Sequence, residues 1–117
     1  MKLRAIRGAI QVGANNPEEI ASGVKELLPA ILQANSLTAE EVISVLLTCT
    51  PDLNAAFPAA FAREIGFGAV PLLCAVEMDV PGSLPLVIRV LMHAELAGDA
   101  NHIYLRGASA LRRDLAQ

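Results

Sequence analysis

Aromatic residues are scarce in this chain of 117 residues, which has three phenylalanines, one tyrosine and no tryptophan. Hydrophobic residues nevertheless make up 54% of it, and the mean hydropathy is +0.48. The core must therefore be built from Val, Ile, Leu and Ala. A membrane-spanning helix needs about 20 consecutive apolar residues, and no such run is present. An apolar surplus in a small chain is typical of a subunit buried against its own copies, so we expect a homo-oligomer and no membrane association.

Cysteine and histidine are also rare. Cys49 and Cys74 both lie in apolar runs, which is typical of reduced thiols in a cytoplasmic protein rather than of a disulfide framework. His93 and His102 have no thiols clustered near them, so no metal site is expected. No glycine-rich phosphate loop and no apolar signal segment occur. The net charge of −3 disfavours nucleic acid as a partner.

Lysine is the rarer of the two basic residue types. The chain has nine basic residues, and only Lys2 and Lys25 are lysines, which leaves seven arginines. Arginine presents a planar fork that matches carboxylate and phosphate groups. A genomic composition bias explains such a ratio equally well, so the positions of the arginines carry more information than their number.

The N-terminal third predicts a strand followed by a long helix. Residues 3–12 are β-branched or small and end near Gly13, which indicates a strand. Asn16 is a good N-cap, Pro17 suits the first helical position, and Glu19 lies three residues after the cap. Apolar residues then recur on one helix face at Ile20, Val24, Leu27, Leu28, Ile31 and Leu32.

Pro29 interrupts this apolar face, and we expect a kink or a loosened last turn before Asn35. The rest of the chain alternates short apolar segments with breaks rich in proline, glycine or asparagine. The predicted strands are residues 42–48, 69–76, 86–95 and 102–106. The predicted helical segments are a capped turn at 38–41, a short helix at 59–65 and a final turn at 108–114.

The predicted element order is β-α-β-α-β-β-β in a single domain of residues 1–117. Strands mixed with amphipathic helices favour an α+β fold with a mixed sheet and helices on one face, in a ferredoxin-like arrangement. The other face of the sheet is also apolar. Because it needs a cover, we expect other subunits to provide one.

Two arginines lie in otherwise apolar strands. Arg7 is either an edge-strand arginine paired with a surface carboxylate or a functional cation. Arg89 lies within residues 86–92, which are apolar enough to be covered on both faces of a sheet. Since a buried guanidinium needs a partner, Arg89 must either form an internal salt bridge or face a ligand-binding cavity.

Glu77 follows the strand predicted at residues 69–76. Cys74 precedes it by three residues, so the two side chains point to opposite faces unless the chain bends or bulges between them. Cys74 is more typical of a small buried hydrophobe than of a nucleophile. Together with Tyr104, the only tyrosine, these residues predict an anion-binding pocket of arginines, one carboxylate and one phenol, and they leave the ligand open.

The chain resembles the monofunctional trimeric chorismate mutases of the bacterial, Bacillus type over essentially its whole length. The Glu-Met-Asp-Val run, the Thr-Pro-Asp-Leu turn and the paired arginines make the match specific in combination. The matching segments are 4–9, 50–53, 55–59, 63–64, 70–71, 74, 77–80, 82, 88–90, 102–105 and 110–112.

The resemblance implies a homotrimer with a β-rich core and active sites between subunits. One subunit is expected to supply Arg7, Cys74, Glu77, Arg89 and Tyr104. The neighbouring subunit is expected to supply Phe57, Ala59, Arg63 and Leu111, with Arg112 near a tail that closes the site. Ala60 stands where the family often has a lysine, so we expect Arg63 or Arg112 to steer a substrate carboxylate.

The implied reaction is the [3,3] rearrangement of chorismate to prephenate in aromatic amino-acid biosynthesis, which needs no nucleophile, metal or cofactor. Arg89 is expected to donate to the ether oxygen, where negative charge grows as the C–O bond breaks. Arg7 and Tyr104 are expected to bind a side-chain carboxylate. Glu77 is expected to accept a hydrogen bond from the ring hydroxyl, and Cys74 is expected to support that hydroxyl as a weak hydrogen-bond partner.

Two other functions stay open from the sequence. A trimeric enamine/imine deaminase also uses an arginine between subunits, but it would leave Glu77 and the second arginine unexplained. A non-catalytic trimeric sensor of aromatic metabolites would bind without turnover, since fold and pocket do not guarantee activity. The alanine at position 60 and the short tail after Leu115 keep this sensor hypothesis open.

Overall fold

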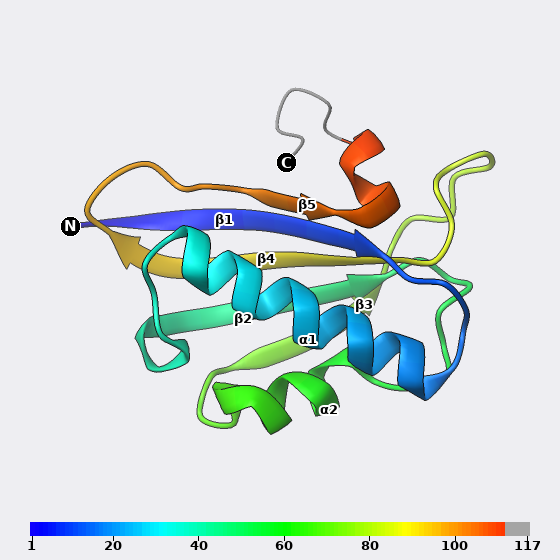
Figure 1. The fold of residues 1–117 in the computed structure, drawn as a ribbon, viewed down its shortest axis with the longest axis horizontal. Coiled ribbons are helices and arrows are strands. Elements are labelled where there is room, and N and C mark those ends of the chain that lie inside the picture. Colours follow the sequence, from blue (N-terminus) through cyan, green and yellow to red (C-terminus); the bar gives the residue numbers. More distant parts are fainter. Residues whose placement is uncertain (112–117) are drawn as a thin grey trace.

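One mixed sheet of five strands organises the computed structural model, which describes residues 1–111 (Figure 1). The strands lie in the order β3-β2-β4-β1-β5. Their bounds are β1 (Lys2–Gln11), β2 (Val42–Cys49), β3 (Leu72–Val76), β4 (Val87–Leu96) and β5 (Ile103–Leu105). The helices are α1 (Pro17–Ala34) and α2 (Pro58–Ala62), and the short helical segments are η1 (Ala39–Glu41), η2 (Arg63–Phe67) and η3 (Arg106–Leu111).

The start of α1 follows from its local sequence. The side chain of Asn16 accepts a hydrogen bond from the backbone N–H of Glu19 at 2.8 Å, as an N-cap should. Pro17 occupies the first turn, and the carboxylate of Glu19 accepts from the backbone N–H of Gly13 at 2.8 Å. The helix continues past Pro29 to Ala34, because its apolar face stays anchored in the core on both sides of the proline.

The predicted order of elements is confirmed, whereas several boundaries differ. The strand expected at 69–76 begins only at Leu72. The last strand ends at Leu105 because Arg106 has a φ of 53° and starts η3. The helical segment after Pro58 runs on through η2 to Phe67, with Gly66 at a φ of 104°, a conformation that glycine adopts without strain.

The strand connections depart from the ferredoxin-like arrangement, and that expectation is wrong. A ferredoxin-like chain follows β-α-β-β-α-β, with a hairpin between its second and third strands. Here α2 returns the chain so that β3 pairs with β2 in parallel. Strand β4 then inserts between β1 and β2, antiparallel to both, and β5 adds to the far edge in parallel with β1.

One face of the sheet carries the main core and both helices, as expected. Strand residues on this face are almost fully buried: Ile6, Ile10, Val45, Leu47, Ile88, Val90 and Met92. Helix α1 lies close to the sheet because Gly8 and Gly23 leave room. A Cβ at Gly8 would come within 2.6 Å of Ile31, and one at Gly23 within 2.6 Å of Val12. This helix-covered face therefore holds the larger of the two apolar clusters of the described residues.

The opposite face, here called the open face, is covered by residues 1–111 only near one end. Tyr104 and Ala108 pack there with Ala9 and Val87 in a small separate cluster under η3. Elsewhere this face leaves large apolar side chains in solvent, including Leu46 at 38% and Leu73 at 62% exposure. Neither helix within residues 1–111 combines the length and apolar character that crossing a membrane requires.

Candidate active site

Two rows of residues that run across the open face build the candidate site. Strand register sets both rows, because residues paired across neighbouring strands point to the same face. The first row, from β3 to β1, is Leu73, Leu46, Leu91 and Arg7. The second row, from β3 to β5, is Ala75, Thr48, Arg89, Ala9 and Tyr104. Charged and hydroxyl groups from four strands therefore meet in adjacent rows.

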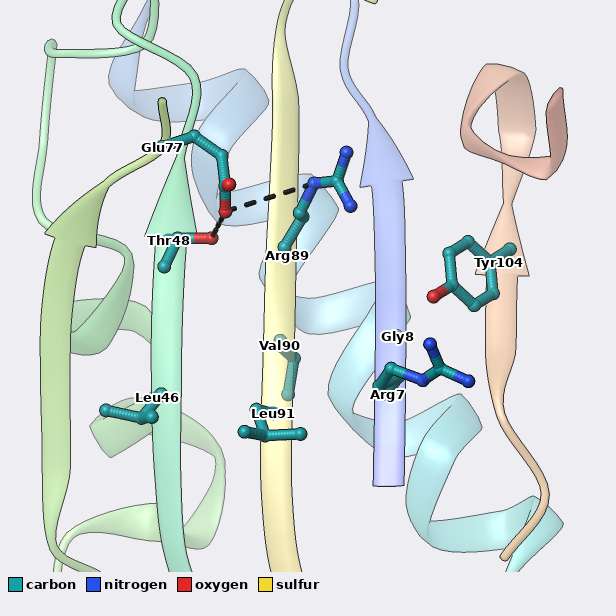
Figure 2. Close-up of a pocket in the computed structure, with 9 residues that line it drawn as sticks. All are labelled: Arg7, Gly8, Leu46, Thr48, Glu77, Arg89, Val90, Leu91 and Tyr104. Atoms are coloured by element: carbon teal, nitrogen blue, oxygen red, sulfur yellow. Dashed lines mark hydrogen bonds and ion pairs between the residues drawn. The ribbon is translucent and has the colours of Figure 1, made fainter. Parts of the chain in front are cut away.

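These rows line a cleft of about 290 Å³ (Figure 2). Its walls are Arg7, Gly8, Leu46, Thr48, Glu77, Arg89, Val90, Leu91 and Tyr104. Four of the residues proposed from the sequence are among these walls, and all four come from one chain: Arg7, Glu77, Arg89 and Tyr104. Leu46 and Leu91 give the cleft an apolar floor beside these polar groups (Figure 2).

Arg89 both forms an internal ion pair and faces a cleft, the two alternatives that the sequence left open. Its side chain is 42% exposed, and the guanidinium extends from β4 toward β1 across the cleft (Figure 2). Its Nε lies 3.9 Å from Oε2 of Glu77, which is an ion pair but too long for a hydrogen bond. This Nε is buried and has no hydrogen-bond partner within residues 1–111. A donor in that state favours an incoming acceptor.

Glu77 lies just past the end of β3 and is held from β2 at two points. Its backbone N–H donates to the carbonyl of Cys49 at 2.8 Å. Its Oε2 accepts a hydrogen bond from Oγ1 of Thr48 at 2.5 Å. Sequence reasoning missed Thr48. No local signal marked it, because a threonine is an ordinary residue in a strand.

Arg7 and Tyr104 form the other end of the cleft. Arg7 is exposed, and its guanidinium makes no ion pair within residues 1–111, so the surface-pair alternative does not hold in that part of the chain. Its backbone N–H donates to Nδ1 of His102 at 2.9 Å, which ties β1 to the start of β5. The ring of Tyr104 is only 4% exposed, and its hydroxyl points toward the Arg7 guanidinium (Figure 2).

The charge balance of the cleft suits an anion. Two guanidinium groups and one carboxylate line it, which leaves one positive charge in excess. Arginine forks bind carboxylates with two parallel hydrogen bonds. Within residues 1–111, His, Cys, Asp and Glu side chains form no group of three close enough to hold a metal ion.

Cys74 does not share the cleft with Glu77. It points to the helix-covered face and lines a second pocket of about 420 Å³ with Phe57 and Cys49, while Glu77 reaches the open face. The bend that would unite Cys74 with Glu77 is absent, and normal strand alternation separates them. Both thiols are free, and burial raises the pKa of Cys49 to about 12, so this thiol stays protonated at neutral pH.

Among the residues expected from a neighbouring subunit, those that the structure describes do not line the cleft of their own chain. Phe57 is 74% exposed and Arg63 is exposed on η2. The methyl group of Ala59 is buried in the core, so a ligand beside it would meet the backbone of the first turn of α2. Leu111 is half-buried against the small cluster under η3. Arg112 lies outside the described residues.

Comparison with known proteins places this chain in one family. A family model described as chorismate mutase type I matches residues 3–115. The chain is 50% identical over 117 residues to chorismate mutase AroH of Thermus thermophilus, covering 97% of this chain and 96% of that protein. It is 42% identical over 120 residues to chorismate mutase AroH of Bacillus subtilis strain 168, covering 99% and 94%.

A solved structure agrees with the sequence comparisons. The chorismate mutase from Clostridium thermocellum superposes with a TM-score of 0.88 at 43% identity, covering 92% of this chain and 98% of that one. The two proteins therefore share the arrangement of helices and strands and a large part of the sequence. The chain belongs to the chorismate mutase type I family.

Proposed function

We propose that this chain rearranges chorismate to prephenate in the open-face cleft, as a step in aromatic amino-acid biosynthesis. The observation that carries the proposal is the meeting of Arg7, Arg89, Glu77 and Tyr104 in one cleft with an apolar floor. The reaction is an intramolecular [3,3] shift, in which one ether C–O bond breaks and one C–C bond forms. Such a reaction needs an enzyme that orients its substrate and stabilises developing charge.

The cleft is suited to orienting the substrate. Chorismate is a dianion, and the excess positive charge of the cleft attracts it. Arg7 binds the side-chain carboxylate through its guanidinium, with Tyr104 as a second donor beside it (Figure 2). Leu46 and Leu91 press on the apolar side of the ligand. Holding the flexible substrate in its folded conformer removes much of the entropic part of the barrier.

The charge that develops during the rearrangement is met by Arg89 and Glu77. Negative charge grows on the ether oxygen, and Arg89 donates a hydrogen bond to it. Glu77 accepts a hydrogen bond from the ring hydroxyl, and its negative charge faces the positive charge that develops on the ring fragment. Losing one preorganised donor of this kind typically costs about 3 kcal/mol of transition-state stabilisation.

The working form in this proposal is a homotrimer. The open face leaves Leu46, in the cleft wall, and Leu73 exposed, and no element within residues 1–111 covers them. A neighbouring subunit that packs here brings Phe57, Arg63, Leu111 and the segment with Arg112 to the cleft edge. Cys74 joins the site only where assembly connects the second pocket with the cleft, since Val76 and Glu77 line the two from adjacent positions.

The direct test is turnover. Purified protein is mixed with chorismate, the loss of its near-ultraviolet absorbance is followed, and prephenate is identified as the product. Enzyme-dependent formation of prephenate that saturates with chorismate supports the proposal. Saturable binding of chorismate without prephenate would contradict it and favour the metabolite-sensor hypothesis.

The shared site is tested by mixing subunits. Arg89→Ala damages the proposed site from within the chain, and Arg63→Ala damages it from the neighbour, so each variant alone should be inactive. After the two are unfolded and refolded together in equal amounts, roughly a quarter of the sites in random trimers receive both arginines. Recovery of about that fraction of wild-type activity supports the proposal. No recovery, or a mass of one 12.3 kDa chain by light scattering, would contradict the trimer.

A further inference from the structure

Thr48 occupies the middle of the row that joins Glu77 to Arg89. Its Cα pairs with Ala75 of β3 on one side and with Arg89 of β4 on the other. Glu77 lies just beyond β3, and its carboxylate points toward the space between Thr48 and Arg89 (Figure 2). The hydroxyl of Thr48 donates to Oε2 of Glu77 at 2.5 Å along this path.

The carboxylate of Glu77 needs such a contact to stay in place. The residue lies outside any strand and is followed by exposed Met78 and Val80. Its backbone is tied down through a single hydrogen bond to Cys49. The buried, unpartnered Nε of Arg89 lies only 3.9 Å from Oε2 and attracts the carboxylate. Without a second tether, Glu77 is free to close on Arg89 and occupy the donor that the substrate needs.

We propose that Thr48 is a positioning residue, which rests on the function proposed above. It holds Oε2 of Glu77 at a fixed distance from Arg89. The other oxygen, Oε1, makes no hydrogen bond or ion pair with another residue of the described chain and is thereby presented to the ligand. Thr48 acts through Glu77 and keeps two opposite charges apart until the substrate enters between them.

Three single variants test the hydroxyl. Thr48→Val keeps the shape and removes the donor, and we expect kcat to fall by roughly tenfold to a hundredfold with KM changed by less than about threefold. Thr48→Ser keeps the donor and should restore kcat to within about threefold of the wild type. The matched control is Ser44→Ala, on the same strand as Thr48. It removes the contact of Ser44 with His93 of β4 and should leave kcat unchanged.

A double-mutant cycle separates positioning from direct substrate contact. If Thr48 acts only through Glu77, its loss has no further effect once Glu77 is gone, so Thr48→Val with Glu77→Ala should be as slow as Glu77→Ala alone. A double variant whose fold loss in kcat equals the product of the two single losses would overturn the proposal, because Thr48 would then act independently of Glu77. A normal kcat for Thr48→Val, or a Thr48→Ser as slow as Thr48→Val, would also overturn it.

A readout without turnover keeps this inference separate from the proposed function. A crystal structure of Thr48→Val, or of Thr48→Ala if the valine variant does not fold, should show the Glu77 carboxylate moved onto Arg89. An unmoved carboxylate would overturn the positioning role, even with a wild type that forms prephenate. A wild type that forms no prephenate would defeat the proposed function, while the displacement would still support the Thr48 tether.

Discussion

The two faces of the sheet divide stability and chemistry between alternate residues of the same strands. On the helix-covered face, Ile6, Ile10 and Ile88 are 0% exposed and pack against α1. On the open face, the neighbouring positions carry Arg7 and Arg89 in a solvent-accessible cleft. The period of two along a strand makes this division possible, because adjacent residues serve opposite faces. One face can therefore be altered with little effect on the other.

Arg89→Ala should give the largest effect, and on activity alone. We expect kcat/KM to fall roughly a thousandfold, because the proposed donor to the ether oxygen is lost. The free energy of unfolding should change by less than about 1 kcal/mol, since the side chain is 42% exposed and Glu77 stays hydrated without it. Chorismate turnover and urea denaturation at one protein concentration measure the two quantities. A thousandfold loss of kcat/KM together with a large loss of unfolding free energy would contradict the division of chemistry and stability between the two faces.

Ile88→Ala, one residue away, should show the reverse. The side chain is fully buried under α1, and its truncation leaves a cavity that costs about 2–5 kcal/mol of unfolding free energy. Below the denaturation temperature, kcat per folded subunit should stay within about threefold of the wild type. The same denaturation and turnover assays apply. A hundredfold loss of kcat in a stable protein would show that the helix-covered face takes part in the chemistry.

Gly8→Ala tests how closely α1 approaches the sheet. A Cβ at this position would lie 2.6 Å from Cδ1 of Ile31 and 3.2 Å from the carbonyl oxygen of Ile103. We expect a loss of about 1–3 kcal/mol in the free energy of unfolding from overpacking. Gly98→Ala is the control, since its Cβ would meet nothing within 4 Å and should be neutral. Equal stability of the two variants would mean that α1 lies farther from β1.

Cys49 should give the smallest effect, at alkaline pH only. Burial raises the pKa of its thiol from 9.0 to about 12, so the unfolded chain ionises in this range before the folded one does. The stability linked to this group is intact below pH 9 and is lost as pH rises toward 12. From pH 8 to pH 10, the wild type should lose about 1 kcal/mol more unfolding free energy than Cys49→Ala. Parallel pH profiles would contradict the burial of this thiol.

Local chemistry made the elements predictable. The start of α1 needs only Asn16, Pro17 and Glu19, which contact one another or lie in one turn. The order of elements follows from similar short-range patterns. The place of β4 between β1 and β2 does not, because strand pairing depends on contacts between residues far apart in the sequence. The ferredoxin-like expectation failed where β3 pairs with β2 in parallel, because that arrangement has a hairpin after its second strand.

The candidate site was predictable in its charges and less so in its connections. Arg7 and Arg89 were conspicuous because each is a cation in an apolar strand, and the structure brings them to one cleft with Glu77. The tether from Thr48 has no local signal, since a threonine in a strand is ordinary. It becomes visible only when the register places Thr48 between β3 and Arg89. The residues expected from a neighbouring subunit stay predictions.

In the proposed function, the open-face cleft is complementary to the transition state rather than to the substrate. Calorimetric titration with a stable bicyclic ether dicarboxylate shaped like that transition state tests it most directly. We expect the wild type to bind this mimic at least about a hundredfold more tightly than chorismate. Arg89→Lys, which keeps the charge and loses the fork, should remove most of that difference. Equal affinity of the wild type for the mimic and for chorismate would contradict the account.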